Sequence, residues 1–153
     1  MLKPLPIVSL ERRLDHAIAK FDKQSDIYLQ FHIARYLIIV TAGYFEQVVQ
    51  VALRKFTKPR ASPQIISYVE ATLAWEGSIN RAKLLHILDR FDPSWFPKIE
   101  ARANDAQKNA VDSIKDLRDQ LAHGAENGTG YGVAKMYHAG VRGYAEHLVA
   151  VLP

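Results

Sequence analysis

The chain has 153 residues, of which 48% are hydrophobic and 24% are charged, a composition that fits one globular domain and argues against a disordered chain. It contains no cysteine, which excludes disulfide bonds, a thiolate nucleophile and a cysteine-based zinc site. The formal net charge of +4 is compatible with an anionic partner. The apolar run at residues 36–45 is too short to cross a bilayer, so we expect a soluble protein, and the lack of cysteine fits the reducing environment of the cytoplasm, where we expect it.

Apolar residues recur at helical spacing along the whole chain, and no run of six residues alternates with period two. We therefore predict an all-α fold, a bundle of about five to six helices that forms a single domain over residues 1–153. The expected helices span residues 9–23, 26–56, 63–75, 79–91, 105–123 and 133–152, with residues 98–104 forming a short helix or a turn.

Capping residues mark the starts of these helices. The expected N-caps are Ser9, Ser25 or Asp26, Ser62 and Ser78. Pro63 then occupies the first helical position, where a missing N–H costs nothing. At the other end of the chain, Gly124 stops the helix that begins at Asp105, and a glycine-rich loop follows.

The helix at residues 26–56 is the longest, and it carries an apolar seam that starts at Ile27 and Phe31. A second apolar stripe flanks the seam, so we expect this helix at the centre of the bundle. Arg35 and Glu46 project to the same side of it. Because a buried charge is costly unless it is paired, they form an interhelical ion pair or a half-exposed edge, or else Glu46 reaches a functional site.

Three polar residues gather where the helix that precedes Gly124 ends. His123 lies on the last turn, where free carbonyl groups and the macrodipole favour the imidazolium form. Asp119 lies four residues earlier, on the side away from the core. Arg118 projects about 140° from His123 on a straight helix. The two side chains therefore meet only if the helix loosens at Gly124 or if a second copy of the chain supplies one of them.

These residue types suit metal-free cleavage of a phosphodiester. His123 can take a proton from a ribose 2′-hydroxyl or donate one to the leaving oxygen. Arg118 offers bidentate donors to the phosphate, and Asp119 can orient His123. The same spacing recurs at Arg81–His86 and Arg142–His147, within helices, where it indicates packing. The alternative for all three candidate residues is that they are solvated at a helix end.

Basic residues provide the predicted contacts to RNA. Lys55, Lys58 and Arg60 form a small basic group at a turn, and Lys115 lies one turn before Asp119. The alternative is that these side chains are only solvated. The histidines form no metal-binding motif, so we expect neither a metal nor a cofactor. The aromatic residues fall at core spacing and predict no base-stacking platform.

The segment Leu117–Gly124, Leu-Arg-Asp-Gln-Leu-Ala-His-Gly near the end of an all-helical domain, resembles the signature of the HEPN superfamily. Ala42 and Glu46 on the long helix add to the resemblance, because HEPN domains commonly carry a small and an acidic residue there. The order of elements from Ser25 to Leu152 is similar to the RiboL-PSP type of HEPN domain. We therefore expect a HEPN-like bundle that forms a homodimer.

The resemblance implies a metal-independent endoribonuclease in which Arg118 and His123 form the site, often across a homodimer, with Asp119 in support. Many members act as toxins or in antiviral defence, and some sit beside an antitoxin, so RNA and an antitoxin or regulatory protein are the expected partners. Some branches carry a tyrosine two residues after the histidine, where this chain has Ala125. Other members have lost catalysis, which leaves two alternatives: a dimerisation or nucleic-acid-binding module, and a nucleotide-binding regulator that uses the loop at 124–132.

Overall fold

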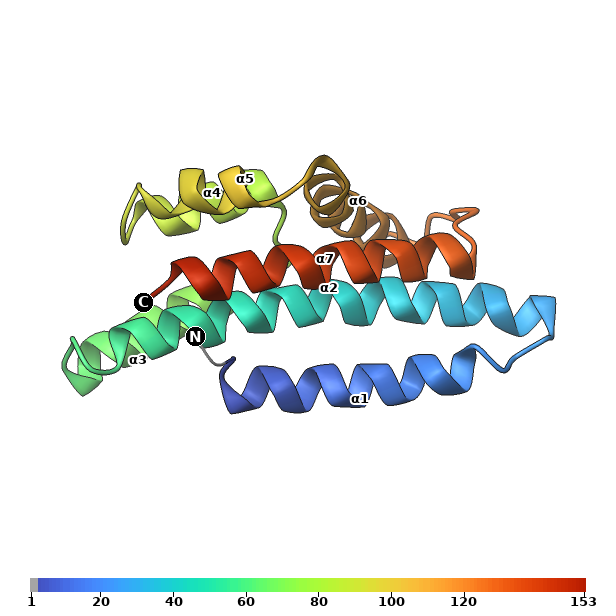
Figure 1. Cartoon of the computed structure of the whole chain (residues 1–153), viewed down its shortest axis with the longest axis horizontal. Coiled ribbons are helices and arrows are strands. Elements are labelled where there is room, and N and C mark those ends of the chain that lie inside the picture. The colour runs from blue at the N-terminus through green and yellow to red at the C-terminus, as the bar shows by residue number, and fades with distance from the viewer. Residues whose placement is uncertain (1–2) are drawn as a thin grey trace.

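In the computed structural model, which describes residues 3–153, the chain forms seven α-helices, and none of these residues is in a strand (Figure 1). The all-α prediction is therefore confirmed, with more helices than the five to six expected. The helices are α1 (Leu5–Phe21), α2 (Ile27–Thr57), α3 (Pro63–Ala74), α4 (Arg81–Asp89), α5 (Trp95–Arg102), α6 (Asp105–Ala122) and α7 (Tyr131–Val151).

Local capping explains where the first two helices begin. The predicted start of α1 at Ser9 is wrong, because the helix already begins at Leu5 and places Pro6 in its first turn, where a proline is tolerated. The predicted start of α2 is confirmed. Asp26 caps that helix, and its side chain accepts hydrogen bonds from two backbone N–H groups of the first turn.

The middle of the chain departs further from the prediction. α4 begins two residues later than expected, because Asn80 rather than Ser78 is its N-cap. Ser78 is instead buried. α5 begins at Trp95, so Pro97 lies in its first turn and the short helix expected at 98–104 starts earlier. This segment is a helix rather than a turn, which raises the helix count.

The helices pack around a central pair. α2 and α7 lie side by side, α1 covers one side of the pair, and α6 crosses on the other side (Figure 1). α4 and α5 continue the layer of α6, and α3 turns back along the end of α2. The largest fully buried side chains come from α1, α2, α4, α5 and α7 and include Ile7, Leu37, Tyr44, Phe45, Leu84, Ile99 and Tyr144.

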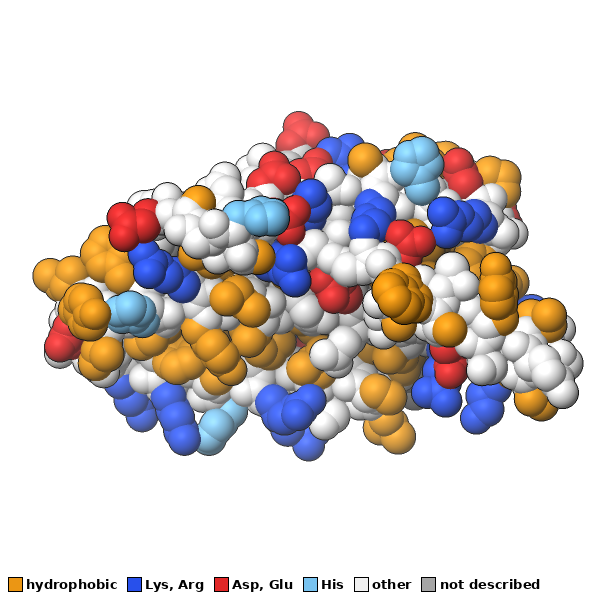
Figure 2. Space-filling model, turned by 180° about the vertical axis from the view of Figure 1, so that it is seen from behind, with side chains coloured by type: hydrophobic (Ala, Val, Ile, Leu, Met, Phe, Trp, Pro, Cys, Tyr) orange, Lys and Arg blue, Asp and Glu red, His pale blue; other side chains and the backbone are white. Residues whose placement is uncertain are grey.

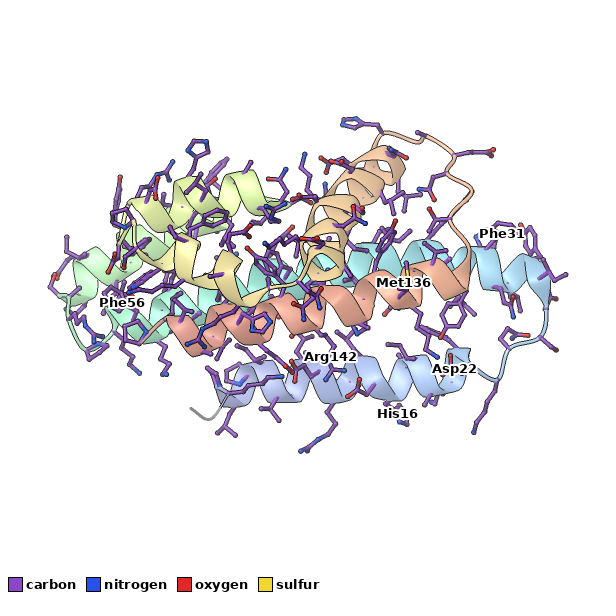
Figure 3. All side chains as sticks on the ribbon, turned by 45° about the horizontal axis from the view of Figure 1, so that its top comes forward. His16, Asp22, Phe31, Phe56, Met136 and Arg142 are labelled. Carbon is purple, nitrogen blue, oxygen red and sulfur yellow. The ribbon has the colours of Figure 1, made fainter. Side chains whose placement is uncertain are left out.

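By length and composition alone, α2 is long and apolar enough to cross a membrane. Yet 56% of its apolar 18-residue stretch is buried inside the protein. Its apolar character is therefore accounted for by the core. The predicted seam is wrong at its start, since Ile27 and Phe31 are exposed beyond the end of α1. Met136 of α7, which helical spacing in the sequence places on an apolar face, is exposed as well (Figure 3).

A polar cluster ties four helices together. The Arg81 guanidinium of α4 donates to Glu100 of α5 over 2.7 Å and to Asp112 of α6 over 3.0 Å. The hydroxyl of Tyr144 on α7 donates to the other Glu100 oxygen over 2.6 Å. Arg81 thus has the packing role that the sequence indicated, and the cluster holds α6 in place beside α7.

Polar contacts also hold α1 against the central pair. Lys135 of α7 donates to Asp22 over 2.8 Å, and Arg142 forms an ion pair with Asp15. Asp22 and Arg142 both lie along the boundary between α1 and α7 (Figure 3). Deeper in this boundary, the Tyr44 hydroxyl of α2 donates to Glu11 over 2.7 Å. α1 therefore covers the side of the bundle opposite α6.

α6 and α7 approach each other closely at a glycine. A Cβ atom built on Gly140 would lie 2.6 Å from the Cβ atom of Ala110 on α6. No real side chains approach so closely, so the crossing of these two helices requires glycine at this position. The crossing fixes where the rest of α6, including its C-terminal end, lies on the bundle.

Candidate functional site

The C-terminal end of α6 is closed by a Schellman motif. The Ala125 N–H donates to the Gln120 carbonyl over 2.9 Å, and the Gly124 N–H donates to the Leu121 carbonyl over 3.1 Å. Gly124 has φ +72°, a left-handed conformation that disfavours residues with a Cβ atom. His123 is the C-cap and its side chain is exposed. The predicted stop of the helix is therefore confirmed, and His123 is presented to solvent.

Asp119 has partners other than His123. It accepts a hydrogen bond from Lys115, one turn earlier, over 2.7 Å, and its other oxygen lies 3.4 Å from the Arg118 guanidinium. The hydrogen bond from Lys115 is the first cause that lowers the pKa of the Asp119 carboxyl group, and Arg118 adds to it. Asp119 therefore holds Arg118 in place, while Lys115, a predicted RNA contact, is engaged with Asp119.

Glu46 of α2 faces the same group of residues. Burial raises the pKa of its carboxyl group, and the largest opposing influence is the positive charge of Arg118. Ser78 and Lys83 also favour the ionised form, while Asp119 disfavours it. Glu46 is therefore within range of the Arg118 charge but has no ion pair with it among the described residues. Ser78, expected only as a helix cap, is an additional neighbour of this carboxylate.

Arg118 and His123 remain apart within one chain. Arg118 is half-buried and faces α2, whereas His123 lies in solvent at the helix end. In the part of the chain that the structure describes, no hydrogen bond or ion pair joins His123 to Arg118 or to Asp119. The separation expected for a straight helix therefore persists, because α6 stays regular up to its cap.

The predicted basic group lies elsewhere. Lys55, Lys58 and Arg60 are exposed at the turn between α2 and α3, at the opposite end of the molecule from the α6–α7 loop (Figure 1). The Arg60 guanidinium lies 4.4 Å from the centre of the Phe56 ring, which Figure 3 labels, and donates to the Phe56 carbonyl over 2.8 Å. These three residues do not line the site around Arg118.

The other histidines are explained by packing. His147 lies within hydrogen-bonding distance of the Gln107 side chain, at 3.2 Å, and His86 is exposed on α4. His138, which the sequence did not single out, is buried and lies 2.9 Å from the Thr41 hydroxyl. His138 directly follows Tyr137, which helical spacing places on the apolar face of the last helix. Nothing in the sequence identifies Thr41 as the partner of His138.

The exposure of two aromatic residues contradicts the prediction that aromatics serve only the core. Trp75 is 90% exposed and Tyr68 is 71% exposed, both on α3 or at its end. Leu73 is the one buried residue of this helix.

No protein-family model, no curated protein and no solved structure matches this chain. Within residues 3–153, no group of three His, Cys, Asp or Glu side chains is placed to hold a metal ion. The chemistry of the site therefore follows from its own side chains: an exposed imidazole, a guanidinium 3.4 Å from the Asp119 carboxylate, and the end of one helix that carries both.

Proposed function

We propose that this protein is a metal-independent endoribonuclease of the HEPN type, with Arg118 and His123 as its catalytic residues. The observation that carries the proposal is the arrangement of α6. It presents His123 to solvent at its C-cap and carries Arg118 beside Asp119, where the charge of Arg118 favours ionisation of Glu46 on α2. The resemblance of Leu117–Gly124 to the HEPN signature supplies the reaction class.

In this proposal His123 moves the proton. As neutral imidazole it takes the proton of a ribose 2′-hydroxyl, which then attacks the adjacent phosphorus, and in protonated form it gives a proton to the leaving 5′-oxygen. Arg118 donates to the phosphate oxygens as their negative charge grows. Asp119 positions Arg118, because one of its oxygens lies 3.4 Å from the guanidinium, and the charges of Glu46 and Arg118 attract each other over a longer range.

We further propose that the working unit is a homodimer. Arg118 and His123 occupy different sides of α6, so a two-fold arrangement that joins the α6 ends of two chains lets one chain's imidazole meet the other's guanidinium. A mixture of Arg118→Ala and His123→Ala chains tests this. If the site is shared, random pairing restores about a quarter of the wild-type activity, since half of the dimers are mixed and each has one intact site. A mixture as inactive as its components would contradict the shared site.

The reaction itself is tested with purified protein, transfer RNA or total RNA, and EDTA. Wild-type protein is expected to cleave RNA, and His123→Ala to lower the rate by about 10²-fold or more, the usual contribution of a general acid or base. His86→Ala is the matched control, because His86 is also exposed and also follows an arginine by five residues. Cleavage that survives in His123→Ala would exclude this mechanism.

The second candidate is a non-catalytic HEPN-like module that dimerises or binds nucleic acid. It is favoured by the lack of any hydrogen bond between Arg118 and His123 within residues 3–153. This candidate predicts that RNA is retained without being cleaved. A cytoplasmic role as a toxin or antiviral-defence effector, with an antitoxin or regulatory protein as partner, remains part of the leading proposal and rests on the resemblance alone.

A further inference from the structure

Two exposed aromatic side chains share one face of α3. Tyr68 and Trp75 are seven residues apart, so they project within about 20° of each other, some 10 Å apart along the axis. They are 71% and 90% exposed. Water contact of this extent is unfavourable for such large apolar rings, and a pair of them at regular spacing indicates a surface that is covered by a ligand.

α3 also connects the two predicted functional regions. It begins at Pro63, directly after the turn that carries Lys58 and Arg60, and it ends at Trp75. Three residues later the chain reaches Ser78, which lies beside Glu46 and therefore near Arg118. Because three residues span at most about 11 Å, Trp75 lies at the edge of the candidate site.

Basic side chains flank α3. Lys58 and Arg60 are exposed in the turn before it, and Arg90 is exposed at the end of α4, where it also donates to Glu76 over 3.0 Å. α3 itself contains no Lys or Arg, and its one carboxylate, Glu70, lies 2.7 Å from Arg54. The face that carries α3 shows hydrophobic side chains at the surface with Lys and Arg along their edges (Figure 2).

A hollow of about 350 Å³ lies next to Tyr68, between α3 and α4. Its floor is formed by Leu73 and Ile87, and Arg90 stands at its rim with a side chain that is 60% exposed. A flat ring that stacks on Tyr68 can extend into this hollow, and a phosphate attached to that ring would meet Arg90.

We infer that the outer face of α3 is a binding subsite for single-stranded RNA, in which Tyr68 and Trp75 stack on unpaired bases and deliver the strand to the site at Arg118. The inference rests on the proposed function for the identity of its ligand. Exposed rings stack on any base, and the surrounding basic groups attract the phosphates without reading sequence. The strand enters at Lys58 and Arg60 and leaves past Trp75.

The geometry favours a single strand over a duplex. Bases in a duplex are stacked on one another and hide their faces, so Tyr68 and Trp75 have no ring to bind there. An apolar protein partner would also cover these rings, but it would gain little from the exposed basic side chains of Lys58, Arg60 and Arg90 that flank the helix. Lys55, Lys58 and Arg60 thus keep their predicted role, at the entrance of the path rather than at the reacting bond.

The test measures binding of a fluorescein-labelled 12-nucleotide oligouridylate to full-length protein carrying His123→Ala, so that cleavage does not interfere. Tyr68→Ala and Trp75→Ala are each expected to weaken binding at least about fivefold, the usual loss of one stacked base. Trp75→Phe keeps an aromatic ring and should retain most of the affinity. Tyr28→Ala is the matched control, because Tyr28 is also 71% exposed but lies at the start of α2; it should leave binding unchanged.

Tryptophan fluorescence gives an independent readout. The other tryptophan, Trp95, is only 5% exposed, so quenching by added RNA reports on Trp75. We expect the single strand to quench the emission and a duplex of the same length to quench it far less. Unchanged affinity in both alanine variants, or equal quenching by the duplex, would overturn the inference and leave the α3 face as a surface for a protein partner.

The inference and the proposed function fail in different ways. If wild-type protein does not cleave RNA but the aromatic variants still lose binding, the ribonuclease proposal is wrong and the subsite stands. If RNA is cleaved in a manner that depends on His123 while Tyr68→Ala and Trp75→Ala bind as wild type does, the subsite is wrong and the ribonuclease proposal stands.

Discussion

The positive charge of Arg118 on α6 is the largest influence that favours ionisation of the Glu46 carboxyl group on α2. The two residues belong to different helices, and only the packing of the bundle brings them near each other. Burial raises the pKa of Glu46, and Arg118 is the first of the groups that oppose this rise. Asp119, 3.4 Å from the Arg118 guanidinium, adds a second carboxylate whose charge attracts it.

Substituting Arg118 by lysine tests the role of its planar donors. Arg118→Lys keeps the positive charge but removes the bidentate geometry, so RNA cleavage is expected to fall about 10²-fold. Stability should change little, because the side chain is 40% exposed and Lys115 still pairs with Asp119. The control is Arg12→Lys, at an exposed position of α1. Equal cleavage rates in the two variants would mean that the guanidinium only supplies charge.

Replacing the Glu46 carboxylate by an amide separates function from stability. Because the pKa of Glu46 is raised in the folded protein, the folded state holds this proton more tightly than the unfolded chain, and ionisation of Glu46 lowers stability as pH rises above its ordinary value of 4.5. Glu46→Gln is therefore expected to raise the melting temperature more at pH 7 than at pH 4, relative to wild type. Cleavage should fall by roughly tenfold, equivalent to about 1.4 kcal/mol of lost positioning.

The opposite outcome for Glu46 is informative. A Glu46→Gln variant that melts at a lower temperature than wild type at pH 7 would show that the attraction to Arg118 outweighs the cost of burying the carboxylate. Glu46 would then be a structural partner of α6, and its effect on cleavage would follow from the loss of folded protein. Thermal unfolding followed by circular dichroism, at both pH values, decides between the two.

The crossing of α6 and α7 is tested at Gly140. Gly140→Ala places a Cβ atom against Ala110 and should lower the free energy of unfolding by about 1–3 kcal/mol, because one helix must shift. Gly43→Ala is the matched control inside α2, where an added Cβ atom meets nothing within 4 Å. It should be neutral or stabilising by up to about 1 kcal/mol. Denaturant unfolding measures both, and equal effects would contradict the close approach.

The buried His138 predicts a dependence of stability on pH. Burial lowers its pKa from 6.5 to about 4, Arg142 on α7 lowers it further, and Asp15 and Glu11 on α1 partly oppose the change. Below pH 6.5 the unfolded chain binds a proton at His138 that the folded protein does not bind. The free energy of unfolding therefore falls as pH drops from 6.5 toward 4, by at most about 3 kcal/mol. The Thr41 hydroxyl can still bond a glutamine amide at this position.

The measurement for His138 is the difference between two proteins, because other carboxyl groups titrate in the same range. The free energy of unfolding of wild type should decline more steeply between pH 6.5 and pH 4 than that of His138→Gln. Parallel curves for the two proteins would mean that His138 accepts its proton in the folded state.

Local signals in the sequence were sufficient to predict where α2 begins and where α6 ends. Asp26 caps α2 through bonds within its own first turn, and Gly124 ends α6 because a left-handed residue disrupts the helix there. Both signals act over four or five residues and need no tertiary contact. His123 directly precedes Gly124, so it lies at the end of the helix, and its side chain is exposed there.

Tertiary packing decided which side chains meet. Periodicity identified an apolar face at Ile27 and Phe31, but α1 does not reach far enough to cover it, and both residues are exposed. In the same way, Tyr68 and Trp75 have core spacing on a helix that buries little. An apolar pattern specifies a face of a helix, whereas the neighbouring helices determine whether that face is covered.

By itself, the sequence determined an all-α bundle, a helix that stops at Gly124, and the presence of Arg118, Asp119 and His123 near that stop. The tertiary structure alone decided which helix faces are covered, so that the charge of Arg118 acts on Glu46 while Tyr68 and Trp75 stay exposed. The physical reason is range: caps and turns act within a few residues, whereas the rotation and crossing of helices depend on how every side chain in the core packs.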